Sequence, residues 1–171
     1  MLTSTKSLLD LTAFDLMSRD VVTIPQSMSL RAAVHMLAQA QVGGAPVVDD
    51  GGRCVGMLSA TDLVRWVDRG EQVRPEPSLA FSGCTCCDWE MVDLHLLPPD
   101  AVSRFMTPDV VTASPDAHIG KLSRWMLDAQ IHRIVITDEQ GKPVGVVSTT
   151  DVLAAVAREE ALTGDPTAEL L

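Results

Sequence analysis

The sequence predicts an α+β fold made of two small repeats, each ordered β-α-β-β-α. The first observation is an internal repeat without gaps: Met17 falls on Met106, Val67 falls on Val156, and fifteen of the fifty-one pairs are identical. The second is that each copy holds one segment of helical periodicity between short, apolar, strand-like runs. The third is length, because 171 residues make one ordinary domain or two small ones sharing a core. A unit of about fifty residues leaves one apolar face of its sheet exposed, and the other repeat is expected to pack against that face.

Each copy is expected to open with a short amphipathic helix, over residues 8–17 and 101–106. An extended Val-Val-Thr run follows and ends at Thr23 or Thr112. Pro25 and Pro115 then mark a turn before the next helix, because proline cannot continue a ladder of backbone hydrogen bonds.

The central helix of each copy is predicted from apolar residues that recur on one face with a period near 3.6. The residues of that face are Leu30, Ala33, Val34 and Leu37 in the first copy, and Ile119, Leu122, Met126 and Ala129, less regularly spaced, in the second.

Two strands and a closing helix complete each copy. The strands are expected over residues 45–48 and 54–58, and over 133–137 and 144–147. The turn between the strands contains a glycine that can adopt a positive φ. The second strand runs into Ser-x-x-Asp and the closing helix.

The charge balance sets the class of partner. Thirteen basic and twenty-three acidic residues give a formal net charge of -10, which repels phosphate backbones and anionic lipid surfaces. Neither nucleic acid nor a membrane is therefore an expected partner. No apolar run approaches the roughly 20 residues of a membrane span, and Asp10 interrupts the N-terminal apolar stretch where a signal peptide would continue. A cytoplasmic protein is expected.

The repeated motif resembles a known family. Two copies of Met-x-x-Asp-Val-Val-Thr, followed by Val-Gly, two apolar residues and Ser-x-Thr-Asp, are similar to a pair of cystathionine-β-synthase (CBS) domains, the Bateman module. The resemblance implies two repeats about a pseudo-twofold axis, a homodimer, and clefts for AMP, ADP, ATP or S-adenosylmethionine. It also implies a regulatory ligand sensor rather than an enzyme. The expected divisions are repeat 1 (8–69), an acidic connector containing Pro and Cys (70–100), repeat 2 (101–158) and an acidic tail (159–171).

The chemistry of Ser-x-x-Asp is compatible with that role. A carboxylate can accept hydrogen bonds from both ribose hydroxyls, and Asp62 and Asp151 each follow a predicted strand at the start of a helix. Ser59 and Ser148 offer hydroxyls beside a helix N-terminus, which favours phosphate. The same pattern is also a capping box that satisfies helix amides and nothing more. The two interpretations are compatible.

The two half-sites differ. The strand of the second copy is preceded by His132 and opens with Arg133, a pair that the resemblance places beside ligand phosphates, whereas the first copy has Gly43 and Gly44. A packed, structural His132 and strand-end packing of the threonines remain alternatives. The Asp151 cleft is the better nucleotide candidate; an empty first cleft, a less anionic ligand and basic residues from a twin or partner chain all stay open. The residues expected to bind ligand are Asp151, Ser148, Thr150, Arg133, His132, Thr112, Asp62, Ser59, Thr23 and Gly44.

Few cations are available to neutralise phosphates. Those near the predicted clefts are Arg31, Lys121, Arg124 and Arg133. A triphosphate would need several cations or a magnesium ion, so a mono- or diphosphate or cationic S-adenosylmethionine is favoured. No resident cofactor is required.

The cysteines suggest a second possibility. Cys84, Cys86, Cys87 and His95 are soft ligands, but adjacent Cys86 and Cys87 do not easily reach one tetrahedral centre. A metal site, a redox-sensitive thiol cluster and a plain connector remain open, while Cys54 alone in an apolar run predicts a small buried thiol.

No catalytic signature accompanies the repeats. The sequence holds no Gly-x-x-x-x-Gly-Lys, Gly-x-Ser-x-Gly or His-Glu-x-x-His, so an enzyme is not expected. The prediction is a stand-alone regulatory pair that signals to a separate, unidentified protein. The alternatives are a structural dimerisation module with degenerate clefts, or a thiol- or metal-responsive protein.

Overall fold

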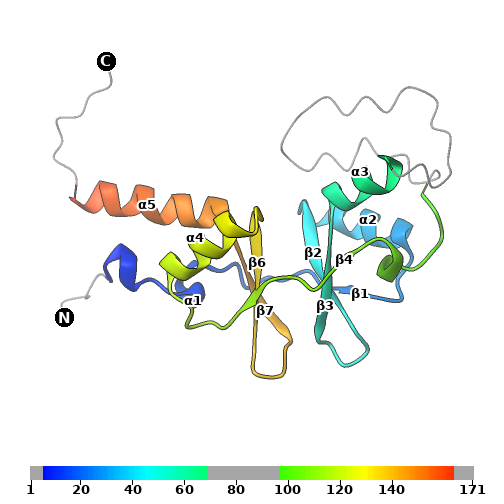
Figure 1. Ribbon diagram of the computed structural model, residues 1–171, viewed down its shortest axis with the longest axis horizontal. Helices are drawn as coiled ribbons and strands as arrows, with labels where there is room; N and C mark the ends of the chain where they lie inside the picture. Colours follow the sequence, from blue (N-terminus) through cyan, green and yellow to red (C-terminus); the bar gives the residue numbers. More distant parts are fainter. Residues whose placement is uncertain (1–5, 69–96, 164–171) are drawn as a thin grey trace, which may run out of the picture. The chain divides into compact units, whose positions relative to one another are not determined.

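A computed structural model of the chain describes residues 6–68 and 97–163, which form two compact units (Figure 1). The Asp151 unit contains residues 6–20, 111–139 and 144–163, and the Asp62 unit contains residues 21–68, 97–110 and 140–143. Each unit combines a sheet with helices and has its own buried apolar cluster. The predicted α+β class is confirmed.

The Asp62 unit is built on a four-stranded sheet of order β1-β2-β3-β4. Its strands are β1 (Ile24–Pro25), β2 (Gly44–Val48), β3 (Cys54–Ser59) and β4 (Thr107–Pro108). Strand β1 runs parallel to β2, and the other neighbouring pairs are antiparallel. Its helices are α2 (Leu30–Gln39), α3 (Ala60–Asp68) and a 3-10 turn at Val102–Arg104.

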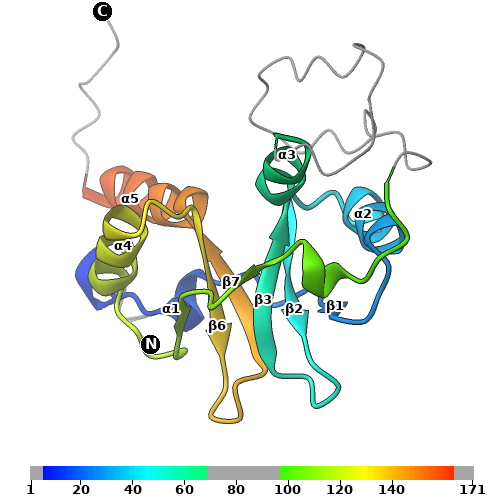
Figure 2. The ribbon, with the colours of Figure 1, turned by 45° about the vertical axis from the view of Figure 1, so that its right-hand side comes forward.

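The Asp151 unit repeats this arrangement with a three-stranded sheet of order β5-β6-β7. Its strands are β5 (Thr112–Ala113), β6 (Arg133–Thr137) and β7 (Pro143–Ser148). Its helices are α1 (Ala13–Leu16), α4 (Ile119–Asp128), α5 (Thr149–Thr163) and a 3-10 turn at Leu8–Asp10. Helices α4 and α5 lie side by side (Figure 2).

The central helices follow the predicted periodicity with one exception. Ser29 caps α2, since its Oγ accepts from the amide of Ala32 at 3.3 Å, and all four apolar residues predicted for the buried face of this helix are buried. In α4 the buried residues are Ile119, Leu122 and Met126. Ala129 is exposed, because α4 ends before it and its backbone forms the C-cap.

Glycine closes the turn between the long strands of each repeat. Gly52 and Gly141 both adopt φ +79°, a conformation that side-chain-bearing residues rarely take. The strands on either side match their predicted ranges to within one residue.

The structure revises the start of each repeat. Residues 8–17 form a 3-10 turn and the four-residue helix α1, separated at Leu11 and Thr12, in place of one amphipathic helix. The second predicted leading helix, over residues 101–106, is likewise only a 3-10 turn at Val102–Arg104. The paired strand of the first copy is Ile24–Pro25, so Pro25 belongs to a strand and the turn follows it. Strand β1 lies at the sheet edge, where proline's missing N–H is tolerated.

The leading segment of each repeat, residues 6–20 for the first and 97–110 for the second, packs against the other repeat. Ser18 pairs with Val146 of β7, and Thr107 of β4 pairs with Met57 of β3. Both pairings place a methionine over a glycine: a Cβ on Gly56 would lie 2.6 Å from Sδ of Met106, and one on Gly145 would overlap Met17. Because the leading segment of each repeat pairs with the sheet of the other repeat, the compact units do not coincide with the sequence repeats.

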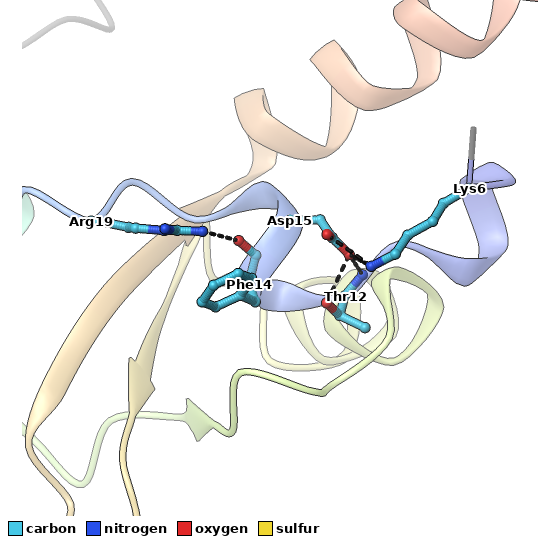
Figure 3. A network of polar contacts seen from close by, with 5 residues as sticks. All are labelled: Lys6, Thr12, Phe14, Asp15 and Arg19. Carbon is cyan, nitrogen blue, oxygen red and sulfur yellow. Dashed lines mark hydrogen bonds and ion pairs between the residues drawn. The ribbon is translucent and has the colours of Figure 1, made fainter. Parts of the chain in front are cut away.

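A polar network fixes the leading segment of the Asp151 unit (Figure 3). Asp15 accepts from the amide and hydroxyl of Thr12 at 2.9 and 2.8 Å, and Lys6 Nζ lies 2.8 Å from its carboxylate. The Lys6 contact and the Thr12 hydrogen bonds lower the pKa of Asp15 to about 2. Beside them, the guanidinium of Arg19 lies 3.9 Å from the ring centre of Phe14.

The predicted connector falls mostly outside the described residues, as do Cys84, Cys86, Cys87 and His95. Helix α5 continues to Thr163 and so includes the first part of the predicted tail. Within residues 6–68 and 97–163, no helix combines the length and the apolar character needed to cross a membrane.

Candidate functional site

The predicted ligand residues of the second repeat gather at one edge of the β5-β6-β7 sheet. Strand β5 begins at Thr112, β6 begins at Arg133, and β7 ends at Ser148, immediately before α5. Thr112 is paired with Val135, two residues into β6. The amide of Thr149 donates to the carbonyl of His132 at 3.0 Å, which joins the start of β6 to the start of α5.

Asp151 has one oxygen engaged and one open. Its Oδ2 accepts from the amide of Ser148 at 2.7 Å and from the hydroxyl of Ser148 at 2.6 Å. The amide of Asp151 donates back to Ser148 Oγ at 3.3 Å, which completes the helix cap. No described residue donates to Oδ1, and the side chain is partly exposed. The cap therefore orients the carboxylate and leaves acceptor capacity for a ligand.

Arg133 is the cation best placed to serve this edge. It opens β6, is partly buried, and has no hydrogen bond or ion pair within the described part of the chain. By contrast, Arg31 donates to the carbonyl of Leu97 at 3.1 Å, and Lys121 lies 4.6 Å from the ring centre of Trp125. Arg124 is exposed on α4. The other predicted residues of this edge, His132, Thr150 and Thr112, are exposed.

The equivalent carboxylate in the first repeat has a different environment. Asp62 is only 5% exposed, and its Oδ2 accepts from the amide and hydroxyl of Ser59 at 2.8 and 2.7 Å. Its Oδ1 accepts from the hydroxyl of Thr107 at 2.6 Å and lies 3.7 Å from Nη1 of Arg65. Both oxygens of this carboxylate are therefore engaged by protein groups.

Close packing explains why glycine stands at positions 43 and 44 of the first repeat, where the second repeat has His132 and Arg133. A Cβ on Gly44 would lie 2.7 Å from the carbonyl oxygen of Leu58, because β2 and β3 pair closely at this point. Gly43 is buried, and its carbonyl accepts from the amide of Ala60 at 3.3 Å. Thr23 precedes β1 and is partly buried. This edge has no counterpart of Arg133.

Thr107 and Arg65 are contacts of Asp62 that the sequence did not predict. Thr107 lies on β4, a strand that the sequence analysis did not predict, and only the fold brings it to Asp62. The repeat offered a signal, since Thr107 and Ser18 are equivalent hydroxyl residues after the equivalent methionines.

The thiol and metal hypotheses rest on Cys84, Cys86, Cys87 and His95, which lie outside the described residues. Within the described ranges, no three His, Cys, Asp or Glu side chains gather as a metal ion would require. Cys54 is partly buried in β3, and burial raises the pKa of its thiol, which keeps it in the less reactive protonated form.

Comparison with known families decides the identity of the repeat. The model of the CBS domain matches residues 13–69 and again residues 102–158. The chain belongs to the CBS-domain family. The two matches confirm the resemblance seen in the sequence and assign one CBS domain to each repeat.

Relatives and solved structures agree with this assignment. The chain is 25% identical over 150 residues to the uncharacterised protein MJ1426 of Methanocaldococcus jannaschii, with 83% of this chain and 89% of that protein covered. It is 28% identical over 134 residues to inosine-5'-monophosphate dehydrogenase of Halobacterium salinarum, with 78% of this chain covered but only 21% of the dehydrogenase.

Among solved structures, the CBS domain of a CBS-domain-containing membrane protein from Sphaerobacter thermophilus is 28% identical, with TM-score 0.65 and coverage of 86% of this chain and 89% of that one. Two others show the same fold at lower identity. The CBS pair of MJ0100, in complex with 5'-methylthioadenosine and S-adenosyl-L-methionine, has TM-score 0.66 at 17% identity, covering 87% and 98%. CBSX2 in complex with AMP has TM-score 0.64 at 21% identity, covering 86% and 96%.

Proposed function

We propose that this CBS-domain pair is a regulatory module that binds an adenosyl ligand at the Asp151 edge and signals to a separate protein. The observation that carries the proposal is the open Oδ1 of Asp151, held in place by the Ser148 cap. Ribose presents two vicinal hydroxyls, and a carboxylate oxygen is a strong acceptor for them.

Phosphate recognition is assigned to the residues around that carboxylate. The Arg133 guanidinium can donate two parallel hydrogen bonds to phosphate oxygens. Ser148, Thr149 and Thr150 stand at the start of α5, a fifteen-residue helix whose free amides favour negative charge. His132 and Thr112 line the same edge. Because Arg133 is the best-placed cation, the proposal favours AMP, ADP or S-adenosylmethionine over ATP, and it includes no magnesium ion held by the protein.

The fold supports the ligand class. MJ0100 and CBSX2, which share the fold, were solved with adenosyl ligands. Binding can shift domain packing or partner affinity only by the difference in ligand affinity between the two states. Regulation without catalysis, a homodimer, a cytoplasmic location and a separate regulated protein are parts of this proposal.

A thermal-shift panel tests the proposal. AMP, ADP, ATP and S-adenosylmethionine are each added to wild type, to Asp151→Ala, and to Asp128→Ala as an exposed-carboxylate control. A ligand at ~100 times its Kd stabilises the folded state by ~2.7 kcal/mol, a rise in Tm of roughly 5–10 °C for a chain of this size. We expect the rise in wild type and Asp128→Ala, and its loss in Asp151→Ala. No rise with any ligand contradicts the proposal.

One observation favours a second candidate, a structural pair with degenerate clefts. Both oxygens of the Asp62 carboxylate accept hydrogen bonds from protein groups. If both aspartates served only to hold the fold together through such hydrogen bonds, Asp151→Ala would lower Tm and no adenosyl ligand would raise it.

A further inference from the structure

We infer that the two equivalent aspartates have separate tasks: Asp62 is a structural tie to Thr107, and only the Asp151 edge accepts ribose, so each chain binds one adenosyl ligand. This inference rests on the proposed function and sets its stoichiometry. It follows from four differences between positions that the repeat makes equivalent.

The first difference is the acceptor capacity that remains on each carboxylate. An ionised carboxylate offers about four lone-pair sites. Asp62 accepts three hydrogen bonds, from the amide and hydroxyl of Ser59 and the hydroxyl of Thr107, and forms a 3.7 Å ion pair with Arg65. Asp151 meets only the amide and hydroxyl of Ser148. Two ribose hydroxyls can therefore be accepted at Asp151 without displacing any protein donor.

The second difference is the hydrogen bond made by the hydroxyl residue that follows the methionine at the start of each repeat, Thr107 or Ser18. Thr107 pairs with Met57, and its twin Ser18 pairs with Val146 at the equivalent place. The Thr107 hydroxyl donates to Asp62 at 2.6 Å, whereas no hydrogen bond joins the Ser18 hydroxyl to Asp151. The same backbone pairing thus closes one carboxylate and leaves the other open.

The third difference is solvent access. Asp62 is 5% exposed, whereas Asp151 is partly exposed at the start of α5. A ribose approaching Asp62 would have to displace the Thr107 hydroxyl from a carboxylate that is almost fully buried, and loss of a hydrogen bond to a buried charged group is costly.

The fourth difference is charge. Arg133 opens β6, and its equivalent Gly44 lies where a Cβ would come within 2.7 Å of Leu58 O. Position 44 therefore has no room for a cationic side chain, and Arg65, the cation beside Asp62, is already paired with that carboxylate. The engaged carboxylate and the missing counterpart of Arg133 point to the same structural task for Asp62.

The ligand-free protein tests the tie. Thr107→Val removes the hydroxyl with little change in shape, and Ser18→Ala is the matched variant on the twin. Loss of a donor to a buried carboxylate predicts a fall in Tm of roughly 3–8 °C for Thr107→Val and no measurable change for Ser18→Ala. Equal Tm values for Thr107→Val and wild type overturn the tie, whatever ligand the protein binds.

Isothermal titration with AMP, ADP and S-adenosylmethionine tests the stoichiometry. Wild type and Thr107→Val are expected to bind one equivalent per chain, and Asp151→Ala none. Asp62→Ala is expected to bind one equivalent of ligand per chain but to unfold at a lower Tm. If Asp62→Ala does not fold, the stoichiometry measured for Thr107→Val replaces it in the test. Two equivalents in wild type, or loss of binding in folded Asp62→Ala, overturn the inference. Absence of binding by wild type with all three probes overturns the proposed function, and the Tm of Thr107→Val then still decides the tie.

Discussion

At the scale of single residues, hydrogen bonds decide what each carboxylate can do. Asp15, Asp62 and Asp151 all accept from a Ser or Thr three residues earlier. They differ in their remaining partners, which are Lys6 for Asp15, Thr107 and Arg65 for Asp62, and none within the described residues for Asp151. An identical local motif therefore supports a structural task in one place and leaves a binding task open in another.

Asp15 gives a prediction about pH. Its folded-state pKa, about 2, lies below the ordinary 3.8, so its contribution to stability is present above pH 3.8 and is lost as the pH falls towards 2. The carboxylate is near the surface, so we expect Asp15→Asn to cost only about 0.5–1 kcal/mol at pH 7. The difference in Tm between wild type and Asp15→Asn should shrink as the pH falls from 3.8 to 2 and vanish below pH 2.

Lys6→Ala is the control for that measurement. It removes the exposed ion pair and retains the hydrogen bonds from Thr12, so it should lower Tm less than Asp15→Asn at pH 7. A Tm difference for Asp15→Asn that is the same at pH 7 and pH 2 would contradict this account.

At the scale of elements, the family motif has a packing explanation. The methionine that opens each copy covers the glycine of Val-Gly in the other copy, Met17 on Gly145 and Met106 on Gly56. A side chain at either glycine would displace the methionine, and with it the pairing of the leading segment. The spacing of the motif thus reflects contact between the two repeats of the sequence inside each compact unit.

Gly145→Ala and Gly56→Ala should each destabilise the protein by about 1–3 kcal/mol through overpacking. Gly120→Ala is the matched control, since nothing lies within 4 Å of a Cβ added at this exposed position in α4. There alanine should stabilise by about 0.5–1 kcal/mol because it favours the helix. Chemical denaturation measures all three, and an unchanged midpoint for both Gly145→Ala and Gly56→Ala would count against the packing role.

Elements also show how far the sequence could predict the structure. Periodicity located α2 and α4, and the apolar runs located β2, β3, β6 and β7, because these signals are local. Strand β4 was missed because two residues carry no periodicity, and its partner Met57 is distant in the chain. For the same reason, the local motif predicts Asp62 and Asp151 but not Thr107, the residue that makes the two carboxylates unequal.

At the scale of the whole molecule, exposed apolar side chains support the proposed homodimer. Val64 on α3 and Leu153 on α5 are equivalent positions, exposed by 43% and 67%. We propose that a second copy of the chain covers these side chains, since two-fold association uses the same surface on both partners. Sedimentation velocity should give a dimer for wild type and a shift towards monomer for Leu153→Glu. A monomeric wild type at micromolar concentration would contradict the proposal.

The most direct test of the central claim is a crystal structure of the protein grown with the adenosyl ligand that raises Tm most. The account predicts one ligand per chain, with both ribose hydroxyls within hydrogen-bond distance of Asp151 and the Thr107–Asp62 hydrogen bond intact. A ribose bound to Asp62, or a ligand bound away from Asp151, would contradict it.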